Sequence, residues 1–341
     1  MEAPSSRGDA TPRAPVLTAF LLGTGLAVVI VLAASKGNIH LTAEGDGLIY
    51  RYVALHLDTP PDQIDPVVVE RGTSLRYGRI GLPGAMWLLA AGQPEAIPYT
   101  HALIMVASAG AAAAAVVVLL PGGGMLGLAL TYLTPAFSLS LAGGFAEVPA
   151  IAAALWAVVF ALRRRWWLCS ALLSVAILTK ESMLLVLIGL ALWVFIWGPL
   201  NALGPLAATV IPVGIWYVVV RDRWGFIPLL DPYLATSDGH RGAPFVALAR
   251  GLVDPPHAHG LITGLVHTGL GVAAIASARV SLLGFLAAVS TLQLLTAGPF
   301  AWAFIGEAVR VFLPLQLFTL LALVVWRKPD IVAPGVTLAR S

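Results

Sequence analysis

The sequence has little charge and almost no cysteine. Of its 341 residues, 11% are charged and 59% are hydrophobic, whereas a soluble domain has roughly 25% charged and 45–50% apolar residues. This composition excludes a soluble globular enzyme and a disordered protein. The single cysteine, Cys169, excludes a disulfide scaffold. No basic stripe with interleaved aromatic residues is present, and with a net charge of only +3 the chain is not expected to bind nucleic acid.

Long apolar runs make up most of the chain, whose mean hydropathy is +0.89. A helix needs about 20 predominantly apolar residues to cross a bilayer. The runs predict about ten transmembrane helices, at residues 15–34, 99–120, 124–141, 146–162, 167–179, 182–198, 203–220, 260–277, 280–297 and 308–326. We therefore expect an all-α, polytopic integral membrane protein. The first run is longer than the apolar part of a signal peptide, so we interpret it as an uncleaved anchor.

Basic residues in short loops predict the orientation of the chain in the membrane. Four clusters, before the first span and after the fourth, eighth and tenth, all lie on one side if there are ten spans: Arg7 with Arg13, residues 163–165, Arg279, and Arg327 with Lys328. We assign that side to the cytoplasm. The prediction is a multi-pass inner (plasma) membrane protein in which cytoplasmic tails, 1–14 and 327–341, flank one membrane domain, 15–326. Segments 35–98 and 221–259 then form long outer loops.

The first outer loop contains an aspartate between two glycines, Gly45-Asp46-Gly47. Tyr50, Val53 and Leu57 follow at helical spacing, which predicts an amphipathic helix along the membrane surface with Asp46 near its N-terminus. Glycine lets the backbone approach a ligand closely, and partial loss of hydration makes a carboxylate a better proton acceptor. The alternative interpretation is a helix cap with a turn glycine.

Further ionisable residues are predicted on the same outer side. Arg76 and Arg79 are three residues apart, and paired guanidinium groups suit a phosphate, although contact with lipid headgroups would also explain them. They precede a run, Leu82 to Ala91, that is too short to cross and predicts an interfacial helix. Charges at span ends are costly and are therefore functional candidates: Glu147, Lys180, Glu181, Glu307 and Arg310. The alternatives are snorkelling towards water and a simple pairing of Lys180 with Glu181.

The second outer loop contains a group of histidines. Asp254, His257 and His259 lie close together, with His240 nearby in the sequence. Two imidazoles and a carboxylate are ligands that zinc accepts. Their spacing matches no established metal site, so loop histidines without a metal are the favoured interpretation.

The order of these features resembles the GT-C superfamily of membrane glycosyltransferases, in particular bacterial members that use polyprenyl-phosphate sugars. The similarity in layout extends from Val16 to Trp326. It rests on four motifs: Gly-Asp-Gly with the following Tyr-Arg helix, Arg-Tyr-x-Arg-x-x-x-Pro from Arg76 to Pro83, Leu-Thr-Lys-Glu from Leu178 to Glu181, and Glu-x-x-Arg-x-x-x-Pro from Glu307 to Pro314.

The resemblance implies roles for particular residues. It implies that Asp46 acts as the general base or positions the acceptor, and that Glu147 is a second acid in place of the more usual aspartate. It also implies that four basic residues bind the donor phosphate, namely Arg76, Arg79, Lys180 and Arg310. Further candidate site residues lie in or beside the motifs, namely Glu44, Tyr50, Glu181 and Glu307. The paired Asp-x-Asp of some eukaryotic members is absent, so the resemblance supports no metal, and no other cofactor is indicated.

The predicted orientation leads to the same chemistry. Nucleotide sugars are charged and cytoplasmic, so a site on the outer side needs a lipid-linked donor. A cation stabilises the leaving phosphate and a carboxylate takes the acceptor's proton. We expect transfer of a sugar from a polyprenyl-phosphate donor to a hydroxyl of a glycan, lipid or protein, on the extracytoplasmic side. A transporter or flippase for a lipid-linked or anionic substrate, and a non-catalytic scaffold, remain the alternatives.

Overall fold

A computed structural model of the chain describes residues 13–43, 45–57, 59, 77–120, 124–225, 227, 258–278, 281–292, 310 and 312–327. Within these ranges the regular elements are helices and no β-strand forms, as expected. In chain order they are α1 (Arg13–Ala34), η1 (Ile39–Leu41), α2 (Asp46–Leu55), α5 (Gly81–Leu89), η3 (Pro94–Ala96), α6 (Ile97–Leu119), α7 (Gly124–Leu133), α8 (Pro135–Ala142), α9 (Glu147–Leu162), α10 (Trp166–Thr179), η4 (Glu181–Met183), α11 (Leu184–Trp197), η5 (Leu200–Ala202), α12 (Leu203–Ala208), α13 (Val210–Trp224), α16 (Ala258–Ser277), α17 (Leu282–Ser290) and α21 (Leu313–Arg327).

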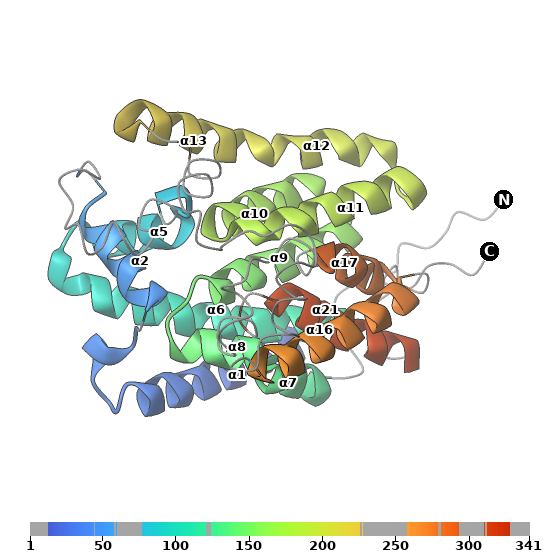
Figure 1. Ribbon diagram of the computed structural model, residues 1–341, viewed down its shortest axis with the longest axis horizontal. Coiled ribbons are helices and arrows are strands. Elements are labelled where there is room, and N and C mark those ends of the chain that lie inside the picture. The colour runs from blue at the N-terminus through green and yellow to red at the C-terminus, as the bar shows by residue number, and fades with distance from the viewer. Residues whose placement is uncertain are drawn as a thin grey trace.

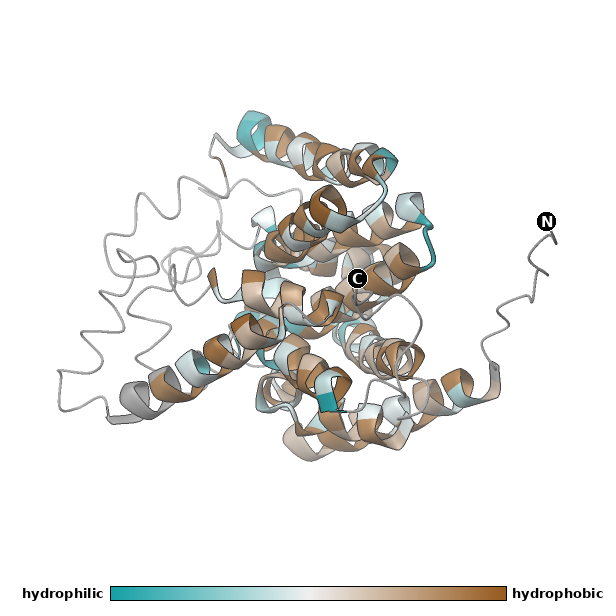
Figure 2. Cartoon of the chain, turned by 90° about the vertical axis from the view of Figure 1, so that its right-hand side faces the viewer, coloured by the Kyte–Doolittle hydropathy of each residue, from teal (hydrophilic) through white to brown (hydrophobic). Residues whose placement is uncertain are grey.

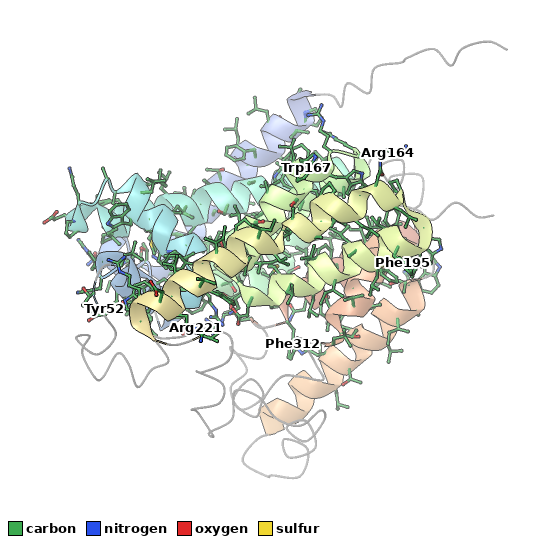
Figure 3. All side chains as sticks on the ribbon, turned by 90° about the horizontal axis from the view of Figure 1, so that it is seen from above. Tyr52, Arg164, Trp167, Phe195, Arg221 and Phe312 are labelled. Carbon is green, nitrogen blue, oxygen red and sulfur yellow. The ribbon has the colours of Figure 1, made fainter. Side chains whose placement is uncertain are left out.

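The longer helices pack into a bundle around α6 and α9. Helix α1 packs on α6, α10 packs on α9, and α16, α17 and α21 pack against one another (Figure 1). The short helices α2 and α5 lie together at one end of the bundle. Figure 3 shows Tyr52 and Arg221 at that end and Arg164 at the other. The two ends therefore carry different polar groups.

Small residues bring α1 and α6 into close contact. A Cβ atom added to Gly23 would lie 2.8 Å from the Cβ of Ala113. The alanine run of α6 is buried from Ala112 to Ala115. Small side chains let helix backbones approach closely, which is how membrane helices commonly associate. The packing surface is therefore already visible in the composition of α6.

Apolar residues cover most of each helix, including surfaces that face away from the protein (Figure 2). Leu17, Phe195 and Val218 are examples of large apolar side chains that stay exposed. Within the described ranges, three helical segments are long and apolar enough to cross a membrane, namely Ala14–Ala34, Pro94–Leu119 and Leu200–Trp224. These features are consistent with a helical membrane protein.

The segment expected as one span at 124–141 is instead two helices. Helices α7 and α8 meet at an angle of 64°, and counting them as one broken span gives a fourth candidate. Pro135 begins α8, because proline fits the first turn of a helix but not its interior. Helices α10 and α11 have 14 residues each, about 21 Å of helix, so ten spans stay a prediction.

Candidate functional site

Asp46 is the first residue of α2, as the sequence predicts. The two glycines beside it have different roles. Gly45 adopts a φ of 47°, which favours glycine. A Cβ atom on Gly47 would lie 2.5 Å from the carbonyl oxygen of Gly143 and 2.9 Å from that of Gly144. Gly47 therefore lets the start of α2 lie directly against the turn between α8 and α9.

A chain of ion pairs connects four distant parts of the sequence. Arg310 Nη2 donates to Asp46 Oδ2 at 3.2 Å, and Arg310 Nε lies 3.5 Å from Glu147 Oε1. The same Glu147 oxygen accepts a hydrogen bond from Lys180 Nζ at 2.8 Å. Asp46 begins α2, Glu147 begins α9, and Lys180 immediately follows α10. The fold thus brings two carboxylates and two cations into one site.

The site is buried but not closed around Asp46. The Glu147 side chain is 2% exposed and that of Asp46 is 14% exposed. Phe145 covers the Arg310 guanidinium, whose Cζ lies 4.1 Å from the ring centroid. Among the described residues, Glu147 Oε2 has no hydrogen-bond partner. A buried carboxylate oxygen without a partner is costly, so Glu147 Oε2 is an acceptor that the described residues leave unused.

A second ion pair lies beside this site. Arg79 donates to both carboxylate oxygens of Glu181, at 2.6 and 2.5 Å, and its Nη1 donates to Tyr50 Oη at 2.9 Å. Burial alone raises the pKa of Glu181, but the charges of Arg79 and Lys180 outweigh it and hold the pKa at about 2. The guanidinium fork of Arg79 is therefore occupied by a carboxylate. Lys180 pairs with Glu147, so the simple pairing with Glu181 that was one interpretation of its charge is not formed.

The structure describes most of the residues that the sequence singled out. Asp46, Glu147, Lys180 and Arg310 come together, and Tyr50, Arg79 and Glu181 form the neighbouring group. The expected short helix at 82–91 is α5. Several candidates lie outside the described residues: Glu44, Arg76, Glu307, His240, Asp254 and His257, while His259 is described only as part of the backbone of α16.

A buried network that the sequence analysis missed supports the same turn. Arg51 Nε donates to His101 Nδ1 at 2.9 Å, and His101 Nε2 lies 2.9 Å from the carbonyl oxygen of Gly144. Since Nδ1 accepts, the ring proton is on Nε2 and donates to Gly144. Burial lowers the pKa of Arg51 to about 10. The sequence does contain a signal for this network, namely His101 within the apolar run of α6, because ionisable residues in such runs are uncommon.

The arrangement provides both a proton acceptor and cations for an anionic group. Asp46 is the more accessible acid, and Arg310 lies between the two acids. In the part of the chain described here, no three His, Cys, Asp or Glu side chains form a group able to hold a metal ion.

Comparison with known proteins gives no further assignment. No family model, no curated protein and no solved structure matches this chain.

Proposed function

We propose that this chain is a membrane glycosyltransferase that moves a sugar from a polyprenyl-phosphate donor to an acceptor hydroxyl on the extracytoplasmic side. The observation that supports it most directly is the ion-pair chain from Asp46 through Arg310 and Glu147 to Lys180. These residues come from four separate segments. A general base and phosphate-binding cations are the minimum set for this transfer.

The proposed reaction assigns one step to each group. The acceptor oxygen forms a bond to the anomeric carbon of the sugar while the bond from that carbon to the phosphate oxygen breaks. The hydroxyl proton moves to Asp46, and the bonding electrons leave with the polyprenyl phosphate. Arg310 stabilises the charge that develops on this phosphate.

The resting ion pair suggests an order of events. Asp46 and Arg310 form an ion pair in which their atoms are 3.2 Å apart. A donor phosphate competes with Asp46 for the guanidinium, and its binding releases the carboxylate to accept a proton. Glu147 and Lys180 hold Arg310 in place from the buried side. Arg79 with Glu181 and Tyr50 supports the wall next to Lys180.

The proposal includes a membrane placement. We propose that ten helices span a bacterial inner membrane and that both termini lie in the cytoplasm. This arrangement puts Asp46 in the outer leaflet. The polyprenyl chain lies among apolar helices, and a glycan, lipid or protein supplies the acceptor hydroxyl. The described helices that are long enough to cross a bilayer support the membrane location, and the basic residues in short loops support the orientation.

The experiment that tests the proposal compares Asp46→Asn with Glu95→Gln. Glu95 is an exposed acid of η3 that takes part in none of these ion pairs, so it is a matched control. Membranes containing each variant receive radiolabelled polyprenyl-phosphate hexoses and pentoses, and labelled glycoside is measured. Asp46→Asn should lower transfer at least about 100-fold, the usual contribution of a general base. Donor binding, measured by native mass spectrometry, should persist. Normal transfer by Asp46→Asn contradicts the assignment of the base.

The bend between α7 and α8 favours a second candidate, a transporter for a lipid-linked anion. Broken helices near polar sites are frequent in transporters, and this break is at Thr134. A transporter needs the cation but no base. In proteoliposomes, movement of labelled polyprenyl phosphate without a glycoside product, unchanged in Asp46→Asn and lost in Arg310→Gln, would favour transport over transfer.

A further inference from the structure

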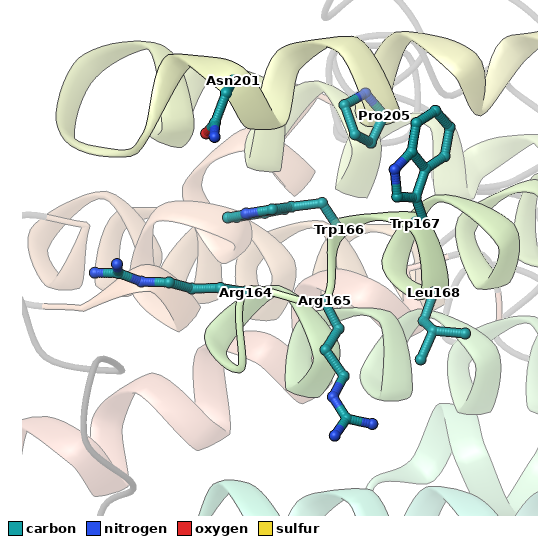
Figure 4. Close-up of a pocket in the computed structure, with 7 residues that line it drawn as sticks. All are labelled: Arg164, Arg165, Trp166, Trp167, Leu168, Asn201 and Pro205. Atoms are coloured by element: carbon teal, nitrogen blue, oxygen red, sulfur yellow. The ribbon is translucent and has the colours of Figure 1, made fainter. Parts of the chain in front are cut away.

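A second polar site lies at the other end of α9 from Glu147. It is a cavity of about 360 Å³ between the turn that joins α9 to α10 and the segment formed by η5 and α12 (Figure 4). The residues that matter for its chemistry are Arg164, Arg165, Trp166, Trp167, Asn201 and Pro205. The volume is within the range of small-molecule pockets, roughly 300–1,000 Å³.

The turn is closed by the backbone of its arginines and not by their side chains. Backbone N–H groups of Arg164 and Arg165 donate back to carbonyl oxygens of α9 and close the turn. Arg164 has a φ of 57°, a conformation that favours glycine or asparagine. Both arginine side chains are exposed, and neither pairs with a carboxylate of the described chain. Two uncompensated positive charges therefore border the cavity.

The remaining lining combines apolar and polar groups. Trp167 is 69% exposed, and Figure 4 shows its ring beside Pro205. In the same view the Asn201 amide points towards Trp166, and the Arg164 side chain extends along the same side. No side chain caps the start of α10, so the helix N-terminus adds to the positive potential. Tryptophan beside arginine is the combination found where helices leave the hydrocarbon region.

We infer that this cavity binds the phosphate-bearing headgroup of an anionic phospholipid. Arg164 and Asn201 contact the phosphate, Arg165 contributes charge, and Trp167 lies towards the acyl chains. The proposed orientation places the cavity at the cytoplasmic leaflet, where anionic lipids attract basic residues. The inference shares the membrane placement proposed above but does not require sugar transfer.

Fluorescence quenching by brominated lipids tests this inference on the full chain in bilayers. Phosphatidylglycerol and phosphatidylcholine, each brominated near the headgroup, are compared, and Trp167→Phe identifies the contribution of that residue. The wild type should prefer the anionic lipid. Arg164→Gln should weaken the preference about 5-fold and Arg164→Gln with Arg165→Gln about 25-fold, because each basic residue that lines the cavity and faces an anionic headgroup contributes a factor of about 5.

Arg163→Gln is the matched control, because Arg163 belongs to the same turn but does not line the cavity. It should retain at least half of the preference. An equal loss in Arg164→Gln and Arg163→Gln would overturn the inference, since it indicates a diffuse surface potential. Competition by inorganic phosphate with no preference between the two lipids would overturn it in favour of a free anion. Asp46→Asn should leave lipid preference unchanged, so failure here and failure of sugar transfer are distinguishable.

Discussion

Removing Lys180 tests whether the ion-pair chain is an energetic feature of the fold. Lys180 Nζ lies 2.8 Å and Arg310 Nε lies 3.5 Å from Glu147 Oε1. With an effective dielectric constant of about 20, the Coulomb attractions are about 6 and about 5 kcal/mol. Desolvation of the charges offsets most of this gain. The net contribution of the ion pairs to the free energy of unfolding is therefore measured by removing one partner.

Lys180→Met removes the charge but keeps a side chain of similar length. Losing one partner of a buried pair costs about 3–5 kcal/mol. Because Arg310 still neutralises Glu147 after the substitution, we expect the lower value, about 3 kcal/mol. That loss raises the unfolding equilibrium constant about 150-fold. Glu147→Gln should cost more, because both cations then lose their shared carboxylate.

The chain provides its own unfolding probe in Cys169, its single cysteine, which is fully buried in α10. Labelling of Cys169 by a maleimide dye in detergent follows the open fraction when opening and closing are fast. We expect labelling of Lys180→Met to be about 150-fold faster than that of the wild type. Arg327→Met removes an exposed cation and should change the free energy of unfolding by less than about 0.5 kcal/mol.

The double variant Lys180→Met with Glu147→Gln separates pairing from local damage. If the two residues stabilise each other, the double variant costs at least about 1 kcal/mol less than the sum of the single variants. Additivity within about 0.5 kcal/mol would refute the reasoning, as would wild-type labelling of Lys180→Met.

Three further changes test the surroundings of the site. Gly47→Ala places a Cβ 2.5 Å from the Gly143 carbonyl oxygen and should destabilise the fold by about 1–3 kcal/mol, whereas Gly25→Ala, with open space around it, should not; Cys169 labelling measures both. His101→Phe leaves Arg51 Nε without its buried acceptor and should cost about 1–3 kcal/mol by the same assay, a result that equal labelling would contradict. The Glu181 pKa of about 2 is below its ordinary 4.5, so its ion pair stabilises the fold above pH 4.5 and this stabilisation is lost as the pH falls towards 2. Thermal melts followed by circular dichroism should show this loss in the wild type and not in Glu181→Gln.

Part of the candidate site is readable from the sequence, because charges in an otherwise apolar chain are few. Asp46, Glu147, Lys180 and Arg310 are singled out by position alone. Their pairing is not readable. The sequence neighbours Lys180 and Glu181 could equally pair with each other, yet each pairs with a residue at least 33 positions away. The role of Gly47 is also hidden, because close approach depends on the segment that packs against it.

The sequence by itself determined that the chain is helical and suited to an apolar environment. Composition and the length of the apolar runs fix how much apolar surface each helix carries, and this surface must face either the protein interior or an apolar solvent. Only the tertiary structure decided that α7 and α8 are separate helices, that His101 supports the turn before Glu147, and which cation neutralises which acid. The physical reason is distance. Hydrophobicity acts on each helix locally, whereas an ion pair depends on a few ångströms between atoms that only the packing of all the helices brings together.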